Sequence, residues 1–239
     1  MKYKFRRTKM GILWTCLIPF MLTLIMGFVF GTVFQQPVLD AIPFILSGLL
    51  VWDILVGSVI ANSACFMSAE AYIRQYANPS VIYSLRASLV SMCSFLIASL
   101  SMVIWVLILN PSTLIIGALS FPLTFVLYLL ISWPISNIAA HIHIRFRDYP
   151  LIMALVMQMV WFLSPVFFRE EMFHANEFLR MLLVINPVTH ILNIFRDPFL
   201  FGRFADARSY LYVLSIIIVL NSLSVLSTKK LEKDIIFHF

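Results

Sequence analysis

Charged residues are scarce in this sequence of 239 residues. Asp, Glu, Lys and Arg together make up 12% of it, against roughly a quarter in soluble domains. Hydrophobic residues make up 62%, against roughly half in soluble domains. A folded chain of this size keeps a large surface, and that surface would here have to be mostly apolar. The composition therefore excludes a water-soluble fold and indicates that lipid is the solvent for much of the chain.

Glycine, proline and cysteine are also rare, with 7, 11 and 3 residues respectively. These numbers exclude collagenous and disordered chains and a disulfide framework. Cys16, Cys65 and Cys93 all lie inside apolar stretches, where cysteine acts as a small hydrophobic residue. We therefore expect neither a redox site nor a metal site.

The motifs of several enzyme classes are absent from the sequence. None of the seven glycines begins a G-x-x-x-x-G-K-[ST] loop, so the chain does not bind ATP in that way. The sequence also contains no H-E-x-x-H, no paired-cysteine motif and no G-x-S-x-G. Metal-assisted hydrolysis and catalysis by a serine nucleophile elbow therefore have no support.

Six apolar stretches are long enough to cross a bilayer, whose hydrocarbon core needs about 20 residues per helix. None shows the ten-residue alternation of a barrel strand, so each must satisfy its backbone hydrogen bonds as a helix. The sequence thus predicts an all-α integral membrane protein with one domain over residues 1–239. The predicted spans are residues 10–34, 41–67, 88–109, 114–140, 150–168 and 210–227.

Basic residues are distributed unequally between the two sides of the membrane. With both termini on one side, that side holds twelve Lys and Arg residues and the other side holds five. The positive-inside rule then predicts that both termini are cytoplasmic. We therefore interpret the net charge of +6 as a consequence of this topology, and it also suits anionic lipid head groups. The sequence contains no basic aromatic platform that would support a nucleic-acid partner.

Three irregular segments lie between the predicted spans. Residues 68–87 form a cytoplasmic amphipathic segment that is typical of a helix at the membrane surface, with a break at Asn78 and Pro79. The second cytoplasmic turn, His141 to Pro150, is short and charged. The extracytoplasmic region 169–209 is too apolar for a solvated loop. It predicts short helices, from Phe178 to Pro187 and from Val188 to Phe201, of a length typical of re-entrant or interfacial segments.

Ionisable residues within the spans are limited to one acid, Asp53, with no Lys or Arg. Ion-driven transport typically needs several such groups. If the chain is a driven transporter, the sequence therefore favours a separate ATPase over an ion gradient as the energy source. Asp53 itself is open to a functional role and to a structural one. We favour the structural role, in which the carboxyl is protonated or bonded to a neighbouring helix.

Two spans carry patterns that indicate helix contacts or a channel wall. Gly27 and Gly31 form a G-x-x-x-G pair on the first span, which permits close approach of another helix within the chain or from a second subunit. The fifth span carries an aromatic stripe with one amide, which suits protein packing, lipid contact or a wall that slides past sugar rings. The stripe consists of Ala154, Gln158, Trp161, Phe162 and Pro165.

The two histidines of the sequence HIHIRFRDY, His141 and His143, are spaced so that they point apart on a helix. No further histidine, cysteine or carboxylate completes a ligand set. We therefore favour an interfacial role for them over a metal or acid-base role. Glu170 and Glu171 are better explained as a solvated start of a loop than as a catalytic pair.

Four short motifs follow one another along the chain: the segment Arg6 to Trp14 before Pro19, Arg145-Phe146-Arg147-Asp148, Ser164-Pro165-Val166-Phe167, and Asn186-Pro187 with Arg196. Their order resembles the type 2 ATP-binding-cassette export permeases that move lipid-linked polysaccharides such as O-antigen, capsule and teichoic acid, and is most similar to the O-antigen branch. The resemblance extends over essentially the whole chain. Members of this family usually carry a longer amphipathic helix before the basic cluster, whereas nine residues precede the first predicted span here.

The resemblance implies a half-transporter in the bacterial inner membrane. Two copies would form one channel for an undecaprenyl-diphosphate-linked polysaccharide, and two ATPase subunits below would hold Mg-ATP, so that this chain needs no cofactor. The implied contacts to the ATPase are Glu70, Tyr72, Arg74, Gln75, Tyr76, Arg145, Arg147 and Asp148. The implied outer gate contains Asn186, Pro187 and Arg196. The candidate channel-lining residues are Phe20, Phe28, Phe34, Gln158, Trp161 and Phe162.

Other functions remain open from the sequence. A type 2 permease for a drug or a lipid would share the fold but have a narrower pore. An intramembrane transferase that acts on lipid-linked sugars would use His141, His143, Arg145 and Asp148 as its site. A purely structural membrane scaffold would bind no ATPase.

Overall fold

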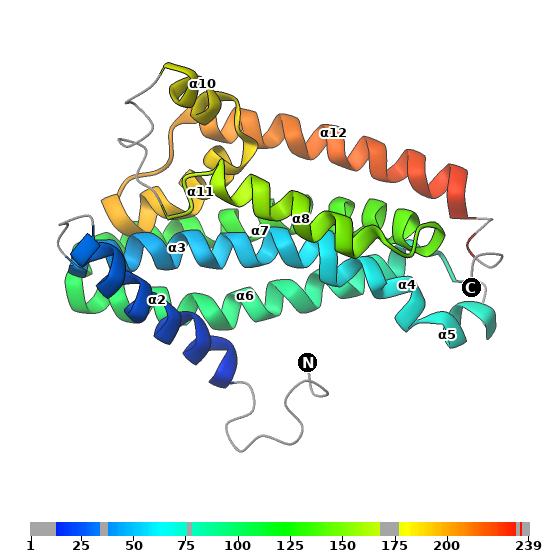
Figure 1. Ribbon diagram of the computed structural model, residues 1–239, viewed down its shortest axis with the longest axis horizontal. Helices are drawn as coiled ribbons and strands as arrows, with labels where there is room; N and C mark the ends of the chain where they lie inside the picture. Colours follow the sequence, from blue (N-terminus) through cyan, green and yellow to red (C-terminus); the bar gives the residue numbers. More distant parts are fainter. Residues whose placement is uncertain (1–12, 34–37, 76–77, 168–176, 233–234, 236–239) are drawn as a thin grey trace. The chain divides into compact units, whose positions relative to one another are not determined.

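The computed structural model describes residues 13–33, 38–75, 78–167, 177–232 and 235 of the chain. These residues form helices and turns and no strand, which confirms the predicted all-α class (Figure 1). The helical elements are α2 (Leu13–Val33), α3 (Val38–Val56), the π-helix η1 (Gly57–Ala61), the 3₁₀-helix η2 (Asn62–Ala64), α4 (Cys65–Ser68), α5 (Glu70–Gln75), α6 (Val81–Leu109), the 3₁₀-helix η3 (Pro111–Thr113), α7 (Leu114–Arg145), α8 (Tyr149–Phe162), α10 (Glu177–Ile185), α11 (Pro187–Arg196), the π-helix η4 (Asp197–Phe201) and α12 (Ala207–Leu231).

Four helical stretches among the described residues are long and apolar enough to cross a membrane. They coincide with the second, third, fourth and sixth predicted spans, and they make the chain a multi-pass membrane protein. Two shorter apolar helices, Leu13–Val29 and Tyr149–Phe162, lie in the first and fifth predicted spans. The four long stretches are Leu39–Ser68, Val81–Leu109, Pro111–Arg145 and Ala207–Leu231.

Several helix ends differ from the predicted ones, and two of these differences follow from proline. α6 begins at Val81, before the predicted start at residue 88, because Pro79 ends the preceding segment and nothing interrupts the helix after it. α8 ends at Phe162 rather than at residue 168, because a turn leads into Pro165. The 14 residues of α8 rise about 21 Å, which is less than the ~30 Å hydrocarbon core.

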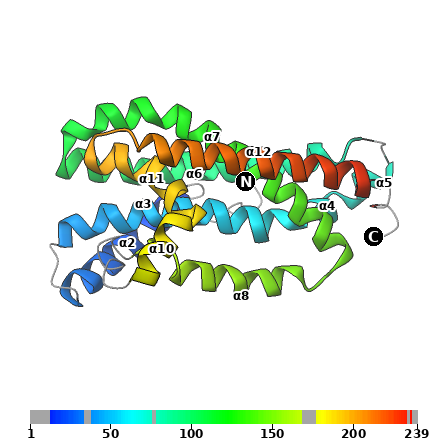
Figure 2. The same cartoon turned by 90° about the horizontal axis from the view of Figure 1, so that it is seen from above.

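The chain folds into two compact units, and the first unit is built around the start of α3. Ala41, Phe44 and Ile45 pack there against Met26 of α2 and Leu200 of η4. Figure 2 shows α2 beside this part of α3. A second cluster joins α6, α7, α11 and η4 through phenylalanine rings whose centroids lie 4.9 to 6.4 Å apart: Phe95, Phe121, Phe195 and Phe199. The unit comprises residues 1–52, 93–124 and 164–210.

The second unit has an apolar core formed by Phe66, Ala140, Ile144 and Ile235. In both ribbon views α5 lies at the end of this unit where α12 ends (Figures 1 and 2). The backbone N–H of Ser80, just before α6, donates to a Glu232 carboxylate oxygen at 2.7 Å, which ties the same end together. The unit comprises residues 53–92, 125–163 and 211–239.

Buried polar side chains connect the helices of the second unit. Asn137 of α7 accepts a hydrogen bond from Ser84 of α6 at 3.0 Å and donates to Ser224 and Thr228 of α12 at 2.9 and 2.8 Å. The amide of Asn62 donates to Ser136 at 3.0 Å. Between apolar helices in lipid, such hydrogen bonds contribute about 0.6 to 2 kcal/mol each and specify which faces meet.

Candidate functional site

The predicted ATPase-contacting segment contains a short helix with an exposed ion pair. On α5 the Nε of Arg74 donates to a carboxylate oxygen of Glu70 at 2.9 Å, across one helical turn. Tyr72 is 60% exposed, and Gln75 is also exposed. Tyr76 lies outside the described residues. α5 thus presents a polar face with one tyrosine ring for contact.

The turn that we predict to be the second cytoplasmic one lies against the base of the same segment. The guanidinium of Arg147 donates to the Met67 sulfur of α4 at 3.3 Å, three residues before α5 begins. Arg145 donates to the backbone oxygens of His141 and Leu231 at 3.1 and 3.4 Å. Asp148 is exposed and directly precedes α8. The structure therefore joins one predicted contact residue, Arg147, to the segment directly before α5, 80 positions away in the chain.

The two histidines of the turn are buried, and each lies within hydrogen-bonding distance of an oxygen atom of the protein. His141 is fully buried, its Nδ1 lies 2.8 Å from the Asn137 backbone oxygen, and its ring packs edge-on against Phe66. The Nδ1 of His143 lies 2.8 Å from the Ser63 hydroxyl. The described residues also contain no cluster of three or more His, Cys, Asp or Glu side chains that could hold a metal ion. This environment differs from the interfacial one that we expected from the sequence and leaves the pair out of reach of a membrane substrate.

The candidate channel-lining residues fall into two sets. In the first unit Phe20 stacks on Trp105 with 5.4 Å between ring centroids, and Phe28 is exposed. In the second unit Gln158 and Phe162 are exposed on α8, and Trp161 is partly buried. Phe34 lies outside the described residues. Their role in a channel stays a prediction.

Asp53 lies on α3, and its side chain is exposed in the second unit. A carboxyl group at the surface of an apolar helix needs a polar neighbour, water or a proton to be stable in lipid. Because its side chain is exposed, Asp53 can contact water or a second subunit. This environment fits a functional role as well as it fits the structural role that we favoured from the sequence.

Gly27 of the predicted helix-packing pair lies in close contact with α3. It is buried, and a Cβ atom at this position would collide with the side chain of Ile42, which is itself 3% exposed. The partner is thus a helix of the same chain. The surroundings of Gly31 lie outside the described residues.

Replacing Gly27 by alanine should lower the thermal unfolding midpoint of the purified protein, because the added methyl group overpacks the contact with Ile42. We expect a loss of about 1 to 3 kcal/mol in unfolding free energy. Adding Ile42→Ala should remove most of that loss, since it deletes the atom that would collide. Gly57→Ala is the matched control, because a Cβ there meets nothing within 4 Å. Equal effects of Gly27→Ala in both backgrounds would contradict the contact.

The predicted outer gate begins at a capped helix. Asn186 precedes α11, and its Oδ1 accepts a hydrogen bond from the backbone N–H of Val188 at 2.9 Å. Its amide nitrogen donates to the Ser164 hydroxyl at 2.9 Å, which ties α11 to the turn after α8. Pro187 occupies the first helical position, where its missing N–H costs nothing.

Arg196 at the end of α11 is the most heavily bonded side chain of this region. It is 2% exposed, and its guanidinium carbon lies 3.8 Å from the centre of the Phe44 ring. Gly48 permits this arrangement, because a Cβ there would collide with the Val166 backbone oxygen. The guanidinium donates to Ser47 Oγ at 3.1 Å and to the backbone oxygens of Pro165, Val166 and Phe44 at 2.9, 3.1 and 3.4 Å.

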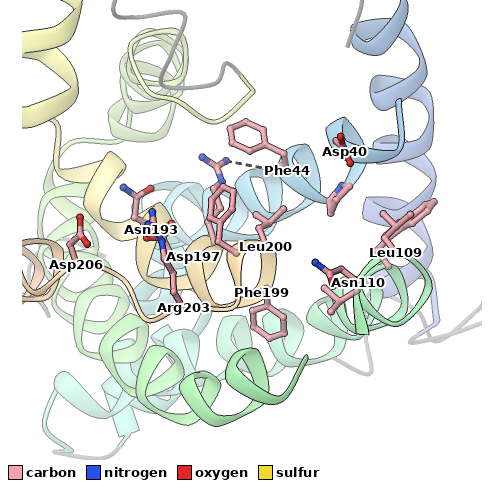
Figure 3. A pocket seen from close by; sticks show the side chains of 15 residues that line it. Asp40, Phe44, Leu109, Asn110, Asn193, Asp197, Phe199, Leu200, Arg203 and Asp206 are labelled. Carbon is pink, nitrogen blue, oxygen red and sulfur yellow. Dashed lines mark hydrogen bonds and ion pairs between the residues drawn. The ribbon is translucent and has the colours of Figure 1, made fainter. Parts of the chain in front are cut away.

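A pocket of about 550 Å³ lies beside Arg196 in the first unit (Figure 3). Figure 3 shows Asp40 and Asn110 on one side of the pocket and a second polar group around Asp197 on the other, with Phe199 and Leu200 between them. Its aromatic wall consists of Phe44, Trp105, Phe199 and Phe201. Its polar wall consists of Asp40, Asn110, Asn193, Arg196, Asp197, Arg203 and Asp206.

Sequence reasoning did not identify this pocket, although a signal for it exists. Asp40 and Asn110 both lie at ends of predicted spans, and the predicted topology puts them on the same side of the membrane as residues 193–206. Polar residues at span ends are common, however, and are ordinarily solvated. Only the packing of η4 against α3, α6 and α7 shows that they share one cavity.

The comparisons with known proteins agree with the resemblance found in the sequence. No known family profile matches the chain. The O-antigen export system permease protein RfbA of Klebsiella pneumoniae is 20% identical over 231 residues, which cover 96% of this chain and 88% of that protein. The protein of the same name from Myxococcus xanthus is 21% identical over 230 residues, with 92% and 84% coverage. A second such protein from Klebsiella pneumoniae is 18% identical over 231 residues.

Proposed function

This chain is a distant relative of the O-antigen export permeases, and from that premise we propose that it is the membrane subunit of an ATP-driven exporter of lipid-linked polysaccharide. The cargo is O-antigen or a similar polymer carried on undecaprenyl diphosphate. Two copies of the chain form the conduit across the bacterial inner membrane, and two separate ATPase subunits drive it. The observation that carries this proposal is the similarity to three permeases over at least 92% of the chain.

A separate energy source is supported by what the sequence lacks. It has no glycine-rich phosphate loop, and its predicted spans hold a single acidic residue, Asp53. Neither nucleotide hydrolysis on this chain nor a relay of several charged groups is therefore available. The protein is a permease and not an enzyme in this proposal, with ATP hydrolysis on its partner.

The contact to the ATPase is assigned to α5 and to the turn at Arg147. Exposed polar side chains on a short helix suit an interface that must transmit motion between two proteins. The hydrogen bond from Arg147 to Met67 would pass a displacement of α5 to the turn between α7 and α8. This assignment places α5 and both termini in the cytoplasm, as the distribution of basic residues predicts.

Six spans remain our proposal for the topology. The four long stretches account for four of them, and the apolar helices α2 and α8 account for the first and fifth. α8 is short for a complete span, but the turn that follows it is bonded to α11 through Ser164 and Asn186. Residues 163–167 would thus continue the crossing as irregular backbone, which is tolerated at membrane depth where protein covers it.

The transferase alternative is weakened by the geometry of its proposed site. His141 is fully buried and His143 is 7% exposed, and both Nδ1 atoms lie within hydrogen-bonding distance of an oxygen of the protein. A general acid or base must reach its substrate directly or through one water molecule. Export should therefore persist after conservative replacement of both histidines in a variant that remains folded.

A deletion strain tests the substrate class. Removing the gene from a host that makes a surface polysaccharide should abolish the polymer on the cell surface and leave undecaprenyl-linked polymer on the inner face of the membrane. Restoring the intact chain should reverse both effects. Normal surface polymer in the deletion strain, with no second permease expressed, would contradict the proposal.

A further inference from the structure

The pocket of the first unit combines flat apolar rings with carboxylate and amide side chains. Its volume of about 550 Å³ lies within the ~300 to 1,000 Å³ typical of small-molecule sites. The labelled polar side chains lie on two opposite sides of it, with Phe199 and Leu200 between them (Figure 3). This arrangement suits a ring-shaped ligand with an apolar face and polar groups around its edge.

The charges of the wall disfavour an anionic ligand. Three carboxylates, those of Asp40, Asp197 and Asp206, line the pocket together with two guanidinium groups. The guanidinium of Arg196 donates four hydrogen bonds to oxygen atoms of the protein. The guanidinium of Arg203 lies 3.9 Å from the Asp197 carboxylate. Little positive charge thus remains to bind a phosphate or a uronic acid.

The donors and acceptors of the wall favour hydroxyl groups. The exposed polar side chains of the lining include the carboxylates of Asp40 and Asp206 and the amide of Asn110. A carboxylate only accepts hydrogen bonds, an amide NH₂ group donates them, and a hydroxyl group does both. A neutral ligand with several hydroxyl groups can therefore satisfy both kinds of wall residue.

We propose that this pocket is a subsite for one neutral sugar ring of the exported polymer and that it discriminates against anionic sugars. The inference rests on the proposed function, since it takes the polymer as the source of the ring. The aromatic wall contacts the C–H face of the ring, and the side chains of Asp40, Asn110 and Asp206 bind its hydroxyl groups. With the predicted topology the subsite faces the outer side of the membrane.

Saturation-transfer NMR on the full chain in lipid nanodiscs tests the subsite. The probes are the methyl glycosides of glucose, galactose and mannose, methyl glucuronide, and glycerol 3-phosphate as a lipid head-group analogue. We expect transfer to the ring C–H protons of at least one neutral glycoside, at least threefold stronger than to methyl glucuronide. Stronger transfer to either anionic probe, or none to any glycoside, would overturn the proposal.

Charge-neutralising variants make the test specific to this pocket. Asp40→Asn combined with Asp206→Asn should reduce the preference for the neutral glycoside at least threefold, because it removes the repulsion of the anionic probe. Both carboxylates are exposed, so the fold should survive. The matched control is Glu177→Gln, an exposed acid that is not part of the wall.

Two results separate this inference from the proposed function. Suppose that the wild-type chain restores surface polymer in the deletion strain. If the NMR preference for the neutral glycoside is then unchanged in the Asp40→Asn, Asp206→Asn variant, the subsite alone is overturned. Failure of the wild-type chain to restore surface polymer would overturn the proposed function, whatever the NMR result.

Discussion

Arg196→Ala should lower the unfolding free energy of the purified protein by at least about 3 kcal/mol, the largest expected loss for a single substitution in the first unit. The substitution removes the guanidinium donor from the Ser47 hydroxyl and from the backbone oxygens of Pro165 and Val166, whereas the Phe44 oxygen still accepts from the Ser47 hydroxyl. Each buried group left unpaired costs about 1 to 3 kcal/mol, and the stacking on Phe44 is lost as well. Thermal unfolding in detergent, followed by the loss of the monodisperse species, measures the effect.

Two further variants show whether the loss comes from the bonding pattern of Arg196. Arg196→Lys keeps the positive charge but offers one compact ammonium in place of the planar fork, so we expect an intermediate loss. Arg180→Ala removes an exposed arginine of the neighbouring helix α10 and should change the midpoint little. If Arg196→Ala and Arg180→Ala have the same effect, the proposed bonding of α11 to α3 is wrong.

Exchanging the charges of α5, with Glu70→Arg and Arg74→Glu together, should abolish export while the permease remains folded in the membrane. The exchange retains an ion pair between the same two positions, and such an exposed pair contributes only about 0.3 to 0.5 kcal/mol. The charge pattern presented to the proposed ATPase partner is reversed, however, and charges that attract across this proposed contact would then repel. ATP hydrolysis should continue without transport, which separate assays of phosphate release and surface polymer detect.

The matched control for this exchange lies on α10. Glu177→Arg with Arg180→Glu reverses two exposed charges on a helix that we assign to the outer side. It should leave both coupling and export intact. Full export by the α5 exchange variant would show that Glu70 and Arg74 do not contact the ATPase.

Much of the helical framework was predictable from the sequence, because lipid imposes simple rules. A long apolar stretch must be helical, so the stretches that contain α3, α6, α7 and α12 were located, with ends that differ by up to seven residues. The short helices of the region 169–209 were predicted less closely: Pro187 was placed at the end of one helix, whereas it is the first residue of α11, a position that favours proline. The prediction of a helical multi-pass membrane protein is confirmed by the described residues.

The contacts of the candidate sites were not predictable in the same way. Three of the four acceptors of Arg196 are backbone oxygens, and every residue carries one, so no sequence pattern marks them. Ser47 lies 149 positions from Arg196 in the chain. The contact between Arg147 and Met67 likewise joins residues 80 positions apart. Such pairs follow from tertiary packing and not from the spacing of residue types along one helix.

The measurement that tests the central claim most directly is transport by the purified chain in liposomes. The chain alone, supplied with lipid-linked polymer and ATP, should move no polymer across the bilayer and release no phosphate. Adding the ATPase that we propose as its partner should start both processes together. Transport or substrate turnover by the chain without any ATPase would contradict the account of a permease powered by a partner.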